Sequence, residues 1–283
     1  MLDKPPGITS AGAVAQVKRL LPKKTKIGHT GTLDPLASGL LVLLIGRATR
    51  LSRYVTGLDK TYTATARFGA VSDTLDAEGE ITHLDTPIPD EPAIRAVLPE
   101  FTGDLLQTPP MASALKREGV RLYDLHRRGL TVEREARSVK IHTLALKDVD
   151  PTEGAATFEV SCTSGTYVRT LIHDLAAALG SGAYLTTLRR HSVGHLTLDA
   201  APTPTELTPD TINNHIIQPS EIVSHLPEVE VAAGIGRDAV CNGRRLGTLG
   251  VEGSCRVMCG GELLAVYRDE GEGARAEVVL CVG

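Results

Sequence analysis

Hydrophobic and polar residues follow two different periods along the chain, and together they predict a protein of mixed helices and strands. Apolar positions from Val14 to Leu21 recur at the spacing of one helical face. Thr9 or Ser10 can cap this helix, and Pro22 ends it. Two further helices are predicted, over residues 92–101 and 167–179.

The strand predictions rest on short apolar runs and on strict alternation. Leu40–Ile45 is a continuous apolar run, which is typical of a strand buried on both faces. From Tyr62 to Phe68 apolar and polar residues alternate, which is the period of a strand. Gly103–Leu115 has no period and is predicted to be a long loop. Further strands are predicted over residues 81–84, 139–146 and 155–162.

The last part of the chain has a different pattern. Three prolines fall between Ala201 and Pro209 and indicate a local linker. Beyond Leu226 short, glycine-separated, strand-like segments predict a small barrel-like domain. Because strands are mixed with only a few helices and do not alternate strictly with them, the fold class is expected to be α+β rather than a doubly wound sheet.

Composition excludes several classes of protein. With 42% hydrophobic and 23% charged residues among 283, the chain is neither disordered nor collagen-like, and it is no coiled coil as a whole. It has no apolar run long enough for a membrane span and no secretory leader, so the cytoplasm is the expected location. The five cysteines are odd in number and scattered, so we expect buried reduced thiols rather than disulfides or structural zinc.

The net charge of -4 conceals an uneven distribution. Residues 1–60 hold ten basic and three acidic side chains, whereas residues 61–110 hold two and nine. Residues 111–150 are again basic, with nine against six, and residues 201–283 are acidic, with six against twelve. Two basic stretches, Lys18 to Lys26 and Lys116 to Lys140, could line one phosphate-facing surface, but two separate solvated faces are the more common arrangement of such residues.

Three groups of residues are candidates for chemistry. Asp34 stands on a rigid Asp-Pro turn directly before a buried strand, and a glycine-flanked histidine, His29, precedes it. Arg169 follows a glycine loop at the first turn of a helix, where it can pair with a carboxylate. Tyr62 shares a strand face with small residues, which leaves room for a planar ring to stack. Each has an ordinary structural alternative: an Asx turn, an exposed arginine and a core tyrosine.

The stretch from Gly28 to Leu41 closely resembles the aspartate motif of the TruB family of tRNA pseudouridine synthases. The resemblance covers about residues 1–200. It continues in the family's order through residues 2–5, 59–62, 73–79, 107–111, 162–170 and 188–190. Residues 243–282 look like the family's C-terminal PUA-like RNA-binding module.

This resemblance implies a fold and a domain division. The fold is α+β, with a mixed, mainly antiparallel central sheet, flanking helices and a thumb-like insertion at about residues 103–140. Residues 1–222 would form the catalytic domain and residues 223–283 a small β-barrel-like PUA domain.

The implied reaction is the isomerisation of uridine to pseudouridine in tRNA, most consistent with uridine 55 of the T loop, without cofactor or metal. By resemblance Asp34 is the catalytic carboxylate, Arg169 holds it ionised, and Tyr62 stacks on the uracil and removes the C5 proton. His29 would fill the space of the flipped bases, and Tyr167 and Leu188 would contact the target nucleotide. Further RNA contacts are expected from Lys4, Lys116 and Arg121.

The resemblance also sets the expected partners: the T arm of tRNA, with no guide RNA and no membrane, bound by a monomer. A guide-dependent, dyskerin-like enzyme is the nearest alternative, but that branch lacks the insertion at residues 107–128. A tRNA-folding chaperone with incidental catalysis is another. A glycoside hydrolase would need a second carboxylate beside Asp34, and the sequence offers no convincing one.

Overall fold

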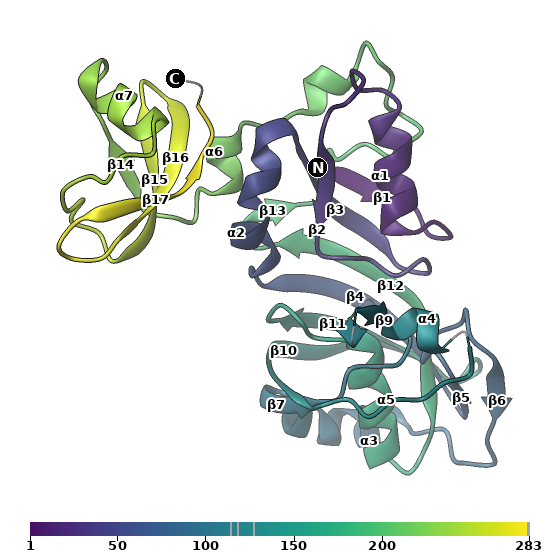
Figure 1. Cartoon of the computed structure of the whole chain (residues 1–283). Coiled ribbons are helices and arrows are strands. Elements are labelled where there is room, and N and C mark those ends of the chain that lie inside the picture. Colours follow the sequence, from purple (N-terminus) through teal and green to yellow (C-terminus); the bar gives the residue numbers. More distant parts are fainter. Residues whose placement is uncertain (114, 118, 127, 282–283) are drawn as a thin grey trace.

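The computed structural model spans residues 1–283 and describes all of them except 114, 118, 127, 282 and 283. One large sheet forms its centre, and its strands stack from β1 and β3 near the N terminus down to β7 (Figure 1). Every pairing in it is antiparallel except β3 with β12, so the expected mixed, mainly antiparallel α+β fold is confirmed. Its strands are β1 (Leu2–Lys4), β2 (Ile27–Thr30), β3 (Ser38–Ile45), β4 (Lys60–Phe68), β7 (Gly103–Gln107), β10 (Arg137–Asp150), β11 (Ala155–Cys162), β12 (Ala183–Val193) and β13 (Leu196–Thr197).

Each of the three stretches predicted to be helical contains a helix, and further helical segments were not predicted. Thr9 caps α1 (Ser10–Lys18) by accepting a hydrogen bond from the Gly12 N–H, as its position before the apolar repeat predicted. The helix α5 (Val168–Ala178) packs against β12 and β4 and buries its apolar face in the central core. The other helical segments are η1 (Gly46–Leu51), α2 (Ser52–Thr56), α3 (Glu91–Val97), η2 (Leu98–Phe101), α4 (Leu122–His126), η3 (Ile212–His215), α6 (Pro219–Ile222) and α7 (Ile235–Cys241).

Strand β3 is buried on both faces, as its uninterrupted apolar sequence predicted. Leu41 belongs to the core between the sheet and α5. Leu40, Val42 and Leu44 point the other way, into a second core shared with α2 and with residues of the C-terminal lobe. The position of β3 in the interior of the molecule therefore fixes the loop that precedes it.

The prediction of a long loop over Gly103–Leu115 is wrong at its start. Residues 103–107 form β7, an edge strand that pairs antiparallel with β10. The strand has one pairing neighbour and leaves Leu106 77% exposed, so no clear apolar pattern marks it. Two further short strands, β8 (Lys116–Arg117) and β9 (Val120–Arg121), precede α4. A separate small ribbon consists of β5 (Ala70–Ser72) and β6 (Ile81–His83).

The C-terminal lobe is built around a four-stranded sheet in the order β14-β15-β16-β17, beside the end of β3 and α2 (Figure 1). Its strands lie where the glycine-separated segments were predicted: β14 (Glu228–Glu230), β15 (Gly253–Cys259), β16 (Glu262–Asp269) and β17 (Ala274–Val279). The lobe is attached by Arg47 and Arg50, which donate to the Leu280 and Val279 carbonyls at 2.9 and 2.6 Å. Among the described residues, no helix has the length and hydrophobicity that a membrane crossing needs.

The expectation that all five cysteines are reduced is wrong for two of them. Cys241 and Cys281 form a disulfide that joins the end of α7 to the chain beyond β17. They are 40 residues apart, and only the packing of α7 against β16 and β17 brings them together. Cys162 and Cys255 are buried free thiols, as predicted, and Cys259 is a half-buried one.

Candidate active site

A pocket of about 440 Å³ opens where the loop between β2 and β3 meets the start of β4, the N terminus of α5 and strand β12. Five residues that the sequence singled out line it: Asp34, Tyr62, Tyr167, Arg169 and Leu188. They come from positions up to 154 residues apart, from 34 to 188, so the fold assembles them. Asp34 is the only carboxylate among the described lining residues.

Arg169 lies between two carboxylates at the back of this pocket. Its guanidinium forms a 3.0 Å ion pair with Asp34 through Nη2 and another 3.0 Å ion pair with Asp76 through Nη1. The same two nitrogens also donate to the Ala112 and Thr74 carbonyls, both at 2.7 Å. Arg169 and Asp76 are 4% and 3% exposed, whereas Asp34 keeps 33% of its side chain exposed. Four partners, two carboxylates and two carbonyls, thus hold the arginine in place, and Asp34 is the partner that faces the pocket.

Sequence reasoning missed Asp76, because a second carboxylate was expected only close to Asp34 or to Arg169 in the sequence. Asp76 reaches Arg169 across 93 residues of sequence. It also accepts hydrogen bonds from the Thr74 hydroxyl at 2.7 Å and the Glu78 N–H at 3.1 Å. Because it is buried and occupied by these donors, Asp76 is a structural anion and not the free second acid of a glycosidase.

Two buried polar side chains hold the Asp34 loop in place. Ser10 accepts a hydrogen bond from the Leu33 N–H at 2.8 Å and donates to the Leu33 carbonyl at 2.9 Å. Lys4 donates from Nζ to the carbonyls of Pro5, Ile8 and Pro35, at 2.9, 2.7 and 3.3 Å. Burial lowers the pKa of Lys4 to about 8. The loop is therefore tied to β1 and α1 on both sides of Asp34.

The protonation state of Asp34 depends on opposing influences. Burial raises the pKa of Asp34 above its ordinary value, and the nearby Asp76 carboxylate adds to this effect. Arg169, through its charge and its ion pair, and Lys4 act in the opposite direction. The carboxylate thus lies in a poorly hydrated site, where its own partners keep it usable as an anion.

Tyr62 and Leu188 reach the pocket from neighbouring strands. Tyr62 on β4 pairs with Arg190 on β12, and Leu188 pairs with Ala64. Tyr62, Ala64, Ala66 and Phe68 are all buried on one face of β4, as the alternation predicted. Burial raises the pKa of the Tyr62 hydroxyl, and the Arg190 guanidinium opposes this. Tyr62 is buried but still contributes to the pocket lining.

Tyr167 is positioned by a residue whose role sequence reasoning did not assign. Gln107, at the end of β7, accepts a 2.7 Å hydrogen bond from the Tyr167 N–H and donates one of 3.0 Å to its carbonyl. Gln107 is buried, and this pair of bonds joins the edge of the sheet to the start of α5. The wrongly predicted loop therefore begins with a strand that fixes the pocket wall.

Lys60 and Arg190 also line the pocket and were missed. Both stand inside motifs that the sequence displayed, Asp59–Tyr62 and Leu188–Arg190. The strand period was the available signal, because Lys60 is two residues from Tyr62 and so lies on the same face of β4. Their charges did not lead to a prediction that they lie in the site, because a lysine or an arginine in a strand is usually exposed.

The remaining predicted residues lie outside the pocket lining. Lys4 is completely buried, so the expected contact with RNA is not available to it, and it braces the Asp34 loop instead. His29 lies on β2 opposite Leu43, and burial lowers its pKa, which favours the neutral ring. Lys116 and Arg121 have described backbones in β8 and β9, but their side chains are outside the described set.

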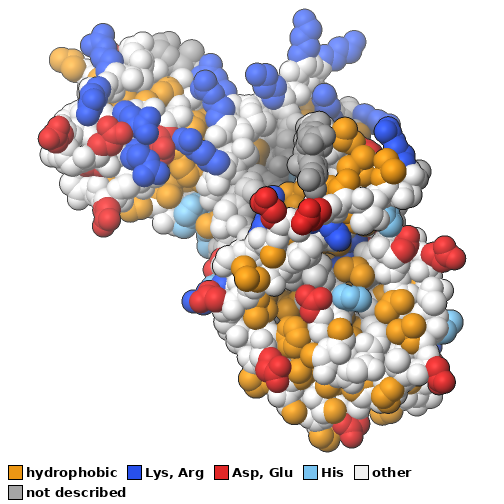
Figure 2. Space-filling model, turned by 60° about the horizontal axis from the view of Figure 1, so that its bottom comes forward, with side chains coloured by type: hydrophobic (Ala, Val, Ile, Leu, Met, Phe, Trp, Pro, Cys, Tyr) orange, Lys and Arg blue, Asp and Glu red, His pale blue; other side chains and the backbone are white. Residues whose placement is uncertain are grey.

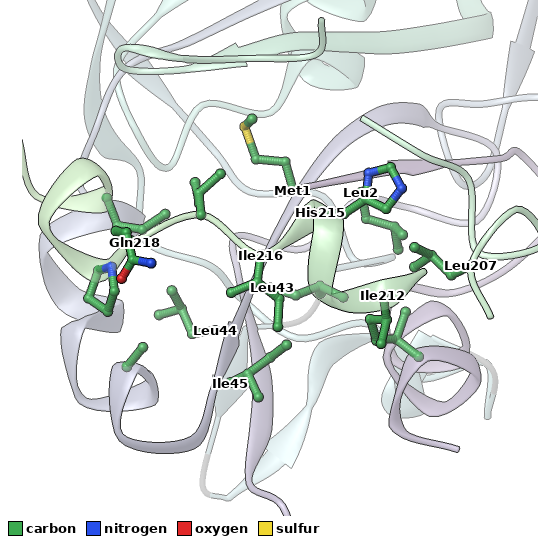
Figure 3. Close-up of a pocket in the computed structure, with 15 residues that line it drawn as sticks. Met1, Leu2, Leu43, Leu44, Ile45, Leu207, Ile212, His215, Ile216 and Gln218 are labelled. Atoms are coloured by element: carbon green, nitrogen blue, oxygen red, sulfur yellow. The ribbon is translucent and has the colours of Figure 1, made fainter. Parts of the chain in front are cut away.

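A second pocket has a different character. It encloses about 140 Å³ beneath β1, β3 and η3, and apolar side chains such as Leu43, Leu44 and Ile212 point into it (Figure 3). His215 is its only titratable side chain among the described residues. Without a carboxylate, a lysine or an arginine, this cavity lacks the groups that the first pocket concentrates.

The fold and the first pocket together define an enzyme: a mixed α+β protein with one pocket-facing carboxylate paired with a buried arginine, beside an aromatic ring. Among the described residues, no cluster of His, Cys, Asp or Glu is arranged to hold a metal ion. The pocket's own reactive groups are Asp34, Tyr62 and their neighbours.

Comparison with known proteins gives the family. The family described as TruB family pseudouridylate synthase (N terminal domain) matches residues 18–168, so the chain belongs to the TruB family. A tRNA pseudouridine synthase B of Cupriavidus metallidurans is 44% identical over 275 residues, which cover 96% of this chain and 87% of that protein. One of Burkholderia mallei is 48% identical over 238 residues, which cover 83% and 78%.

Solved structures agree with this assignment. A chain in the crystal structure of a Cbf5-Nop10-Gar1 complex matches with a TM-score of 0.71 and 26% identity, over 99% of this chain and 83% of that one. A chain in the archaeal box H/ACA sRNP Nop10-Cbf5 complex matches with a TM-score of 0.70, 26% identity and coverage of 99% and 84%. The expected pseudouridine synthase fold and isomerase activity are therefore confirmed.

Proposed function

We propose that this enzyme converts uridine 55 in the T loop of tRNA to pseudouridine, without a guide RNA or a cofactor. The observation that carries the proposal is the Asp34–Arg169 ion pair in a pocket beside Tyr62. The relatives named tRNA pseudouridine synthase B, 44 to 48% identical, support tRNA as the substrate. Their identity to this chain exceeds the 26% found for the chains matched in the Cbf5-Nop10-Gar1 and box H/ACA sRNP Nop10-Cbf5 complexes, which favours a reaction without a guide RNA.

The reaction rearranges atoms within one nucleotide. The bond from N1 of uracil to C1′ of the ribose breaks, the base turns, and a bond forms from C5 to C1′. The C5 proton leaves and N1 gains a proton, so the atoms balance. Asp34 would attack the sugar, attack the base or remove a ribose proton, and each of these roles requires its ionised form in the pocket.

The neighbouring residues have separate roles in this proposal. Arg169 orients Asp34 and keeps it ionised, since an opposite charge at 3.0 Å favours the carboxylate. Tyr62 stacks on the uracil and accepts the C5 proton. Tyr167 and Leu188, which also line the pocket, contact the target nucleotide.

The target uridine must first leave the stacked loop, at a cost of a few kcal/mol. A pocket of about 440 Å³ has room for the flipped base and part of its ribose. His29, held neutral by burial, would fill space vacated by the flipped bases. Lys116 and Arg121 would contact the phosphate backbone of the T arm.

The C-terminal lobe completes the proposal. Residues 1–222 would form the catalytic domain, with residues 103–140 as a thumb-like insertion, and residues 223–283 a PUA-like RNA-binding domain. The four-stranded sheet over residues 228–279 is consistent with such a module. A monomer acting on tRNA in the cytoplasm fits this arrangement.

Replacing Asp34 by Asn tests the proposal directly. Asn keeps the shape but removes the charge, so pseudouridine formation should fall by at least about 1,000-fold while tRNA affinity changes little. The wild-type protein and the variant are incubated with an unmodified tRNA transcript, and pseudouridine is mapped at single-nucleotide resolution. A wild-type product outside the T loop would contradict the assignment. If cells that carry Asp34→Asn lose pseudouridine but keep the effect of the wild-type protein, the protein would act as a tRNA-folding chaperone.

A further inference from the structure

Two buried cations in the pocket have no carboxylate partner among the described residues. Lys60 is 6% exposed and Arg190 is 1% exposed, and both line the pocket. Neither forms a salt bridge with a described acid, whereas Arg169, the third cation there, is neutralised by two. Buried charges in proteins are normally paired. The proposed active site therefore contains two positive charges that no described carboxylate neutralises in an ion pair, although Asp59 and Cys162 partly oppose the charge of Lys60 from nearby.

Backbone carbonyls hold both side chains in place without neutralising them. Lys60 donates from Nζ to the Thr56 carbonyl at 2.8 Å and to the Leu58 carbonyl. Arg190 donates from Nε to the Leu40 carbonyl at 2.8 Å and from Nη2 to the Gly31 carbonyl at 3.1 Å. These carbonyls use two of the three ammonium N–H donors and two of the five guanidinium donors, so each cation keeps further donors. Preorganised donors of this kind suit a charge that appears during a reaction.

The two cations converge on one place beside Tyr62. A Cβ built on Gly31 would lie 3.6 Å from Arg190 Nη1 and 3.7 Å from Lys60 Cε, so both reach the same side of this glycine. Tyr62 is two residues from Lys60 and is the cross-strand partner of Arg190. A ring stacked on Tyr62 would therefore have its edge within reach of both charges.

Mutual repulsion between the two cations indicates that this place suits an anion. Burial lowers the pKa of Lys60 to about 8, and the Arg190 charge lowers it further than any other neighbour does. The fold thus maintains two like charges close together at an energetic cost. An anion supplied by the substrate would remove that cost.

We infer that Lys60 and Arg190 are catalytic residues that contact the carbonyl oxygens of the flipped uracil and stabilise the negative charge that the base acquires during isomerisation. This inference rests on the proposed function. When the N1–C1′ bond breaks, its electron pair stays on N1, and the charge is shared with O2 and O4. If Asp34 instead adds to C6 of the base, the displaced electron pair reaches O4 as an enolate. Negative charge therefore develops on the base whichever role Asp34 takes.

A phosphate is the other anion that a nucleotide could present. The depth of the two cations favours the base, because both are at least 94% buried next to Tyr62 and not at the exposed rim. A flipped nucleotide keeps its phosphates outside the pocket, joined to the RNA backbone, while its base enters. The base edge is accordingly the group that can reach them.

The test compares two leaving groups. Single-turnover rates are measured with tRNA transcripts that carry uridine or 5-fluorouridine at the target position, because fluorine withdraws electrons and stabilises the uracil anion by itself. Consumption of the modified nucleoside is followed by mass spectrometry. Lys60→Gln keeps two N–H donors but removes the charge, and Lys60→Arg keeps the charge. Lys147→Gln is the matched control, since Lys147 is half exposed on the sheet and paired with Glu159.

Lys60→Gln should reduce the single-turnover rate with uridine by roughly 10- to 100-fold and leave the tRNA affinity unchanged. The reduction of the rate with 5-fluorouridine should be much smaller. Lys60→Arg should retain most of the rate, and Lys147→Gln all of it. An equal loss on both substrates would overturn the inference, as would weaker tRNA binding at an unchanged rate, which marks a phosphate contact. If Lys60→Gln does not melt cooperatively, the Lys60→Arg variant provides the test instead. A severe loss of rate on both substrates in Lys60→Arg, which keeps the charge, would contradict a role for that charge. Absence of pseudouridine with the wild-type protein would contradict the proposed function itself.

Discussion

Arg169 shows how much of the site depends on one buried guanidinium. It joins Asp34, which faces the pocket, to Asp76, which is buried among donors of its own loop. Since Asp76 already balances the arginine, the Asp34 carboxylate is oriented by Arg169 without being neutralised completely by it. Lys60 and Arg190, in contrast, line the pocket without an ion-pair partner among the described residues.

The pH dependence of catalysis should reflect two of these groups. The raised pKa of Asp34 means that activity falls as the pH decreases through a value above the ordinary aspartate range. The pKa of Lys60, about 8, means that activity falls again as the pH rises through that value and the charge is lost. The charged or titratable groups around Lys60 are Arg190, Cys162 and Asp59.

Single-turnover rates between pH 5 and 10 check this prediction. In Lys60→Arg the guanidinium stays charged, so the alkaline decrease should disappear while the acidic decrease remains. An alkaline decrease that persists unchanged in Lys60→Arg would show that another group, such as Tyr62, titrates there.

At the scale of elements, the parallel contact between β3 and β12 brings two backbones close together at Gly39. Gly39 on β3 has a φ of +100° and faces Arg190 of β12. A Cβ at this position would lie 2.2 Å from the Arg190 carbonyl oxygen, so a larger residue forces the strands apart. Because the neighbouring β2–β3 loop carries Asp34 and β12 carries Arg190, separation here would disturb both sides of the pocket.

Gly39→Ala should therefore destabilise the protein by about 2–4 kcal/mol and reduce pseudouridine formation in the fraction that still folds. Thermal melting and the single-turnover assay measure the two effects. Gly28→Ala is the matched control, because a Cβ on Gly28 meets nothing within 4 Å and its φ is not positive. Equal melting temperatures for the two variants would contradict the argument.

The elements that the sequence predicted well are those that a local pattern specifies. The alternation of β4, the apolar run of β3 and the capped start of α1 each follow from neighbouring residues. The edge strand β7 was not predicted, because a strand with one pairing neighbour and an exposed leucine shows little hydrophobic pattern. The helix α7 was not predicted, because it is only seven residues long and begins after a glycine.

The site divides in the same way. Asp34, Tyr62 and Arg169 stand in motifs with recognisable sequence, and the structure places all three in one pocket. Asp76 and Arg190 act through contacts that span 93 and 159 residues, with Arg169 and Gly31 respectively. Contacts at such separation depend on the register of the strands, which no local pattern provides.

At the scale of the whole molecule, the C-terminal lobe is a distinct packing unit joined to the catalytic part by a shared apolar core and a few polar contacts. Tyr54 donates to Glu277 at 2.8 Å across this junction, beside the bonds made by Arg47 and Arg50. All described residues lining the catalytic pocket precede residue 191. The stability of the lobe and the chemistry of the pocket should therefore be separable.

Reduction of the Cys241–Cys281 disulfide tests this separation. A link that closes about 40 residues contributes roughly 3–4 kcal/mol by limiting the unfolded chain. Dithiothreitol should lower the melting temperature of the lobe and leave the rate of pseudouridine formation on bound tRNA nearly unchanged. Cys259→Ser, which removes a free thiol, is the control. Identical melting with and without the reductant would show that the disulfide contributes nothing to the lobe.

The charge distribution predicts where tRNA phosphates bind. Lys and Arg side chains gather on the upper part of one face and also over the C-terminal lobe, although the lobe's segment is acidic overall (Figure 2). Lys24 and Lys26 are exposed, precede β2 and have no salt bridge among the described residues, whereas Arg245 pairs with Glu270.

Uncompensated lysines release more counterions on binding than an arginine already paired with an acid. Lys24 and Lys26 are replaced together by Gln. The slope of log affinity against log salt concentration should then become less steep by about 0.7–0.9 for each phosphate that the variant no longer neutralises. The matched double variant, Arg244→Gln with Arg245→Gln, should change this slope little. Titrations of labelled tRNA between about 50 and 200 mM salt measure both slopes. Equal flattening in the two variants would show that the acidic lobe holds RNA phosphates as firmly as the basic N-terminal segment does.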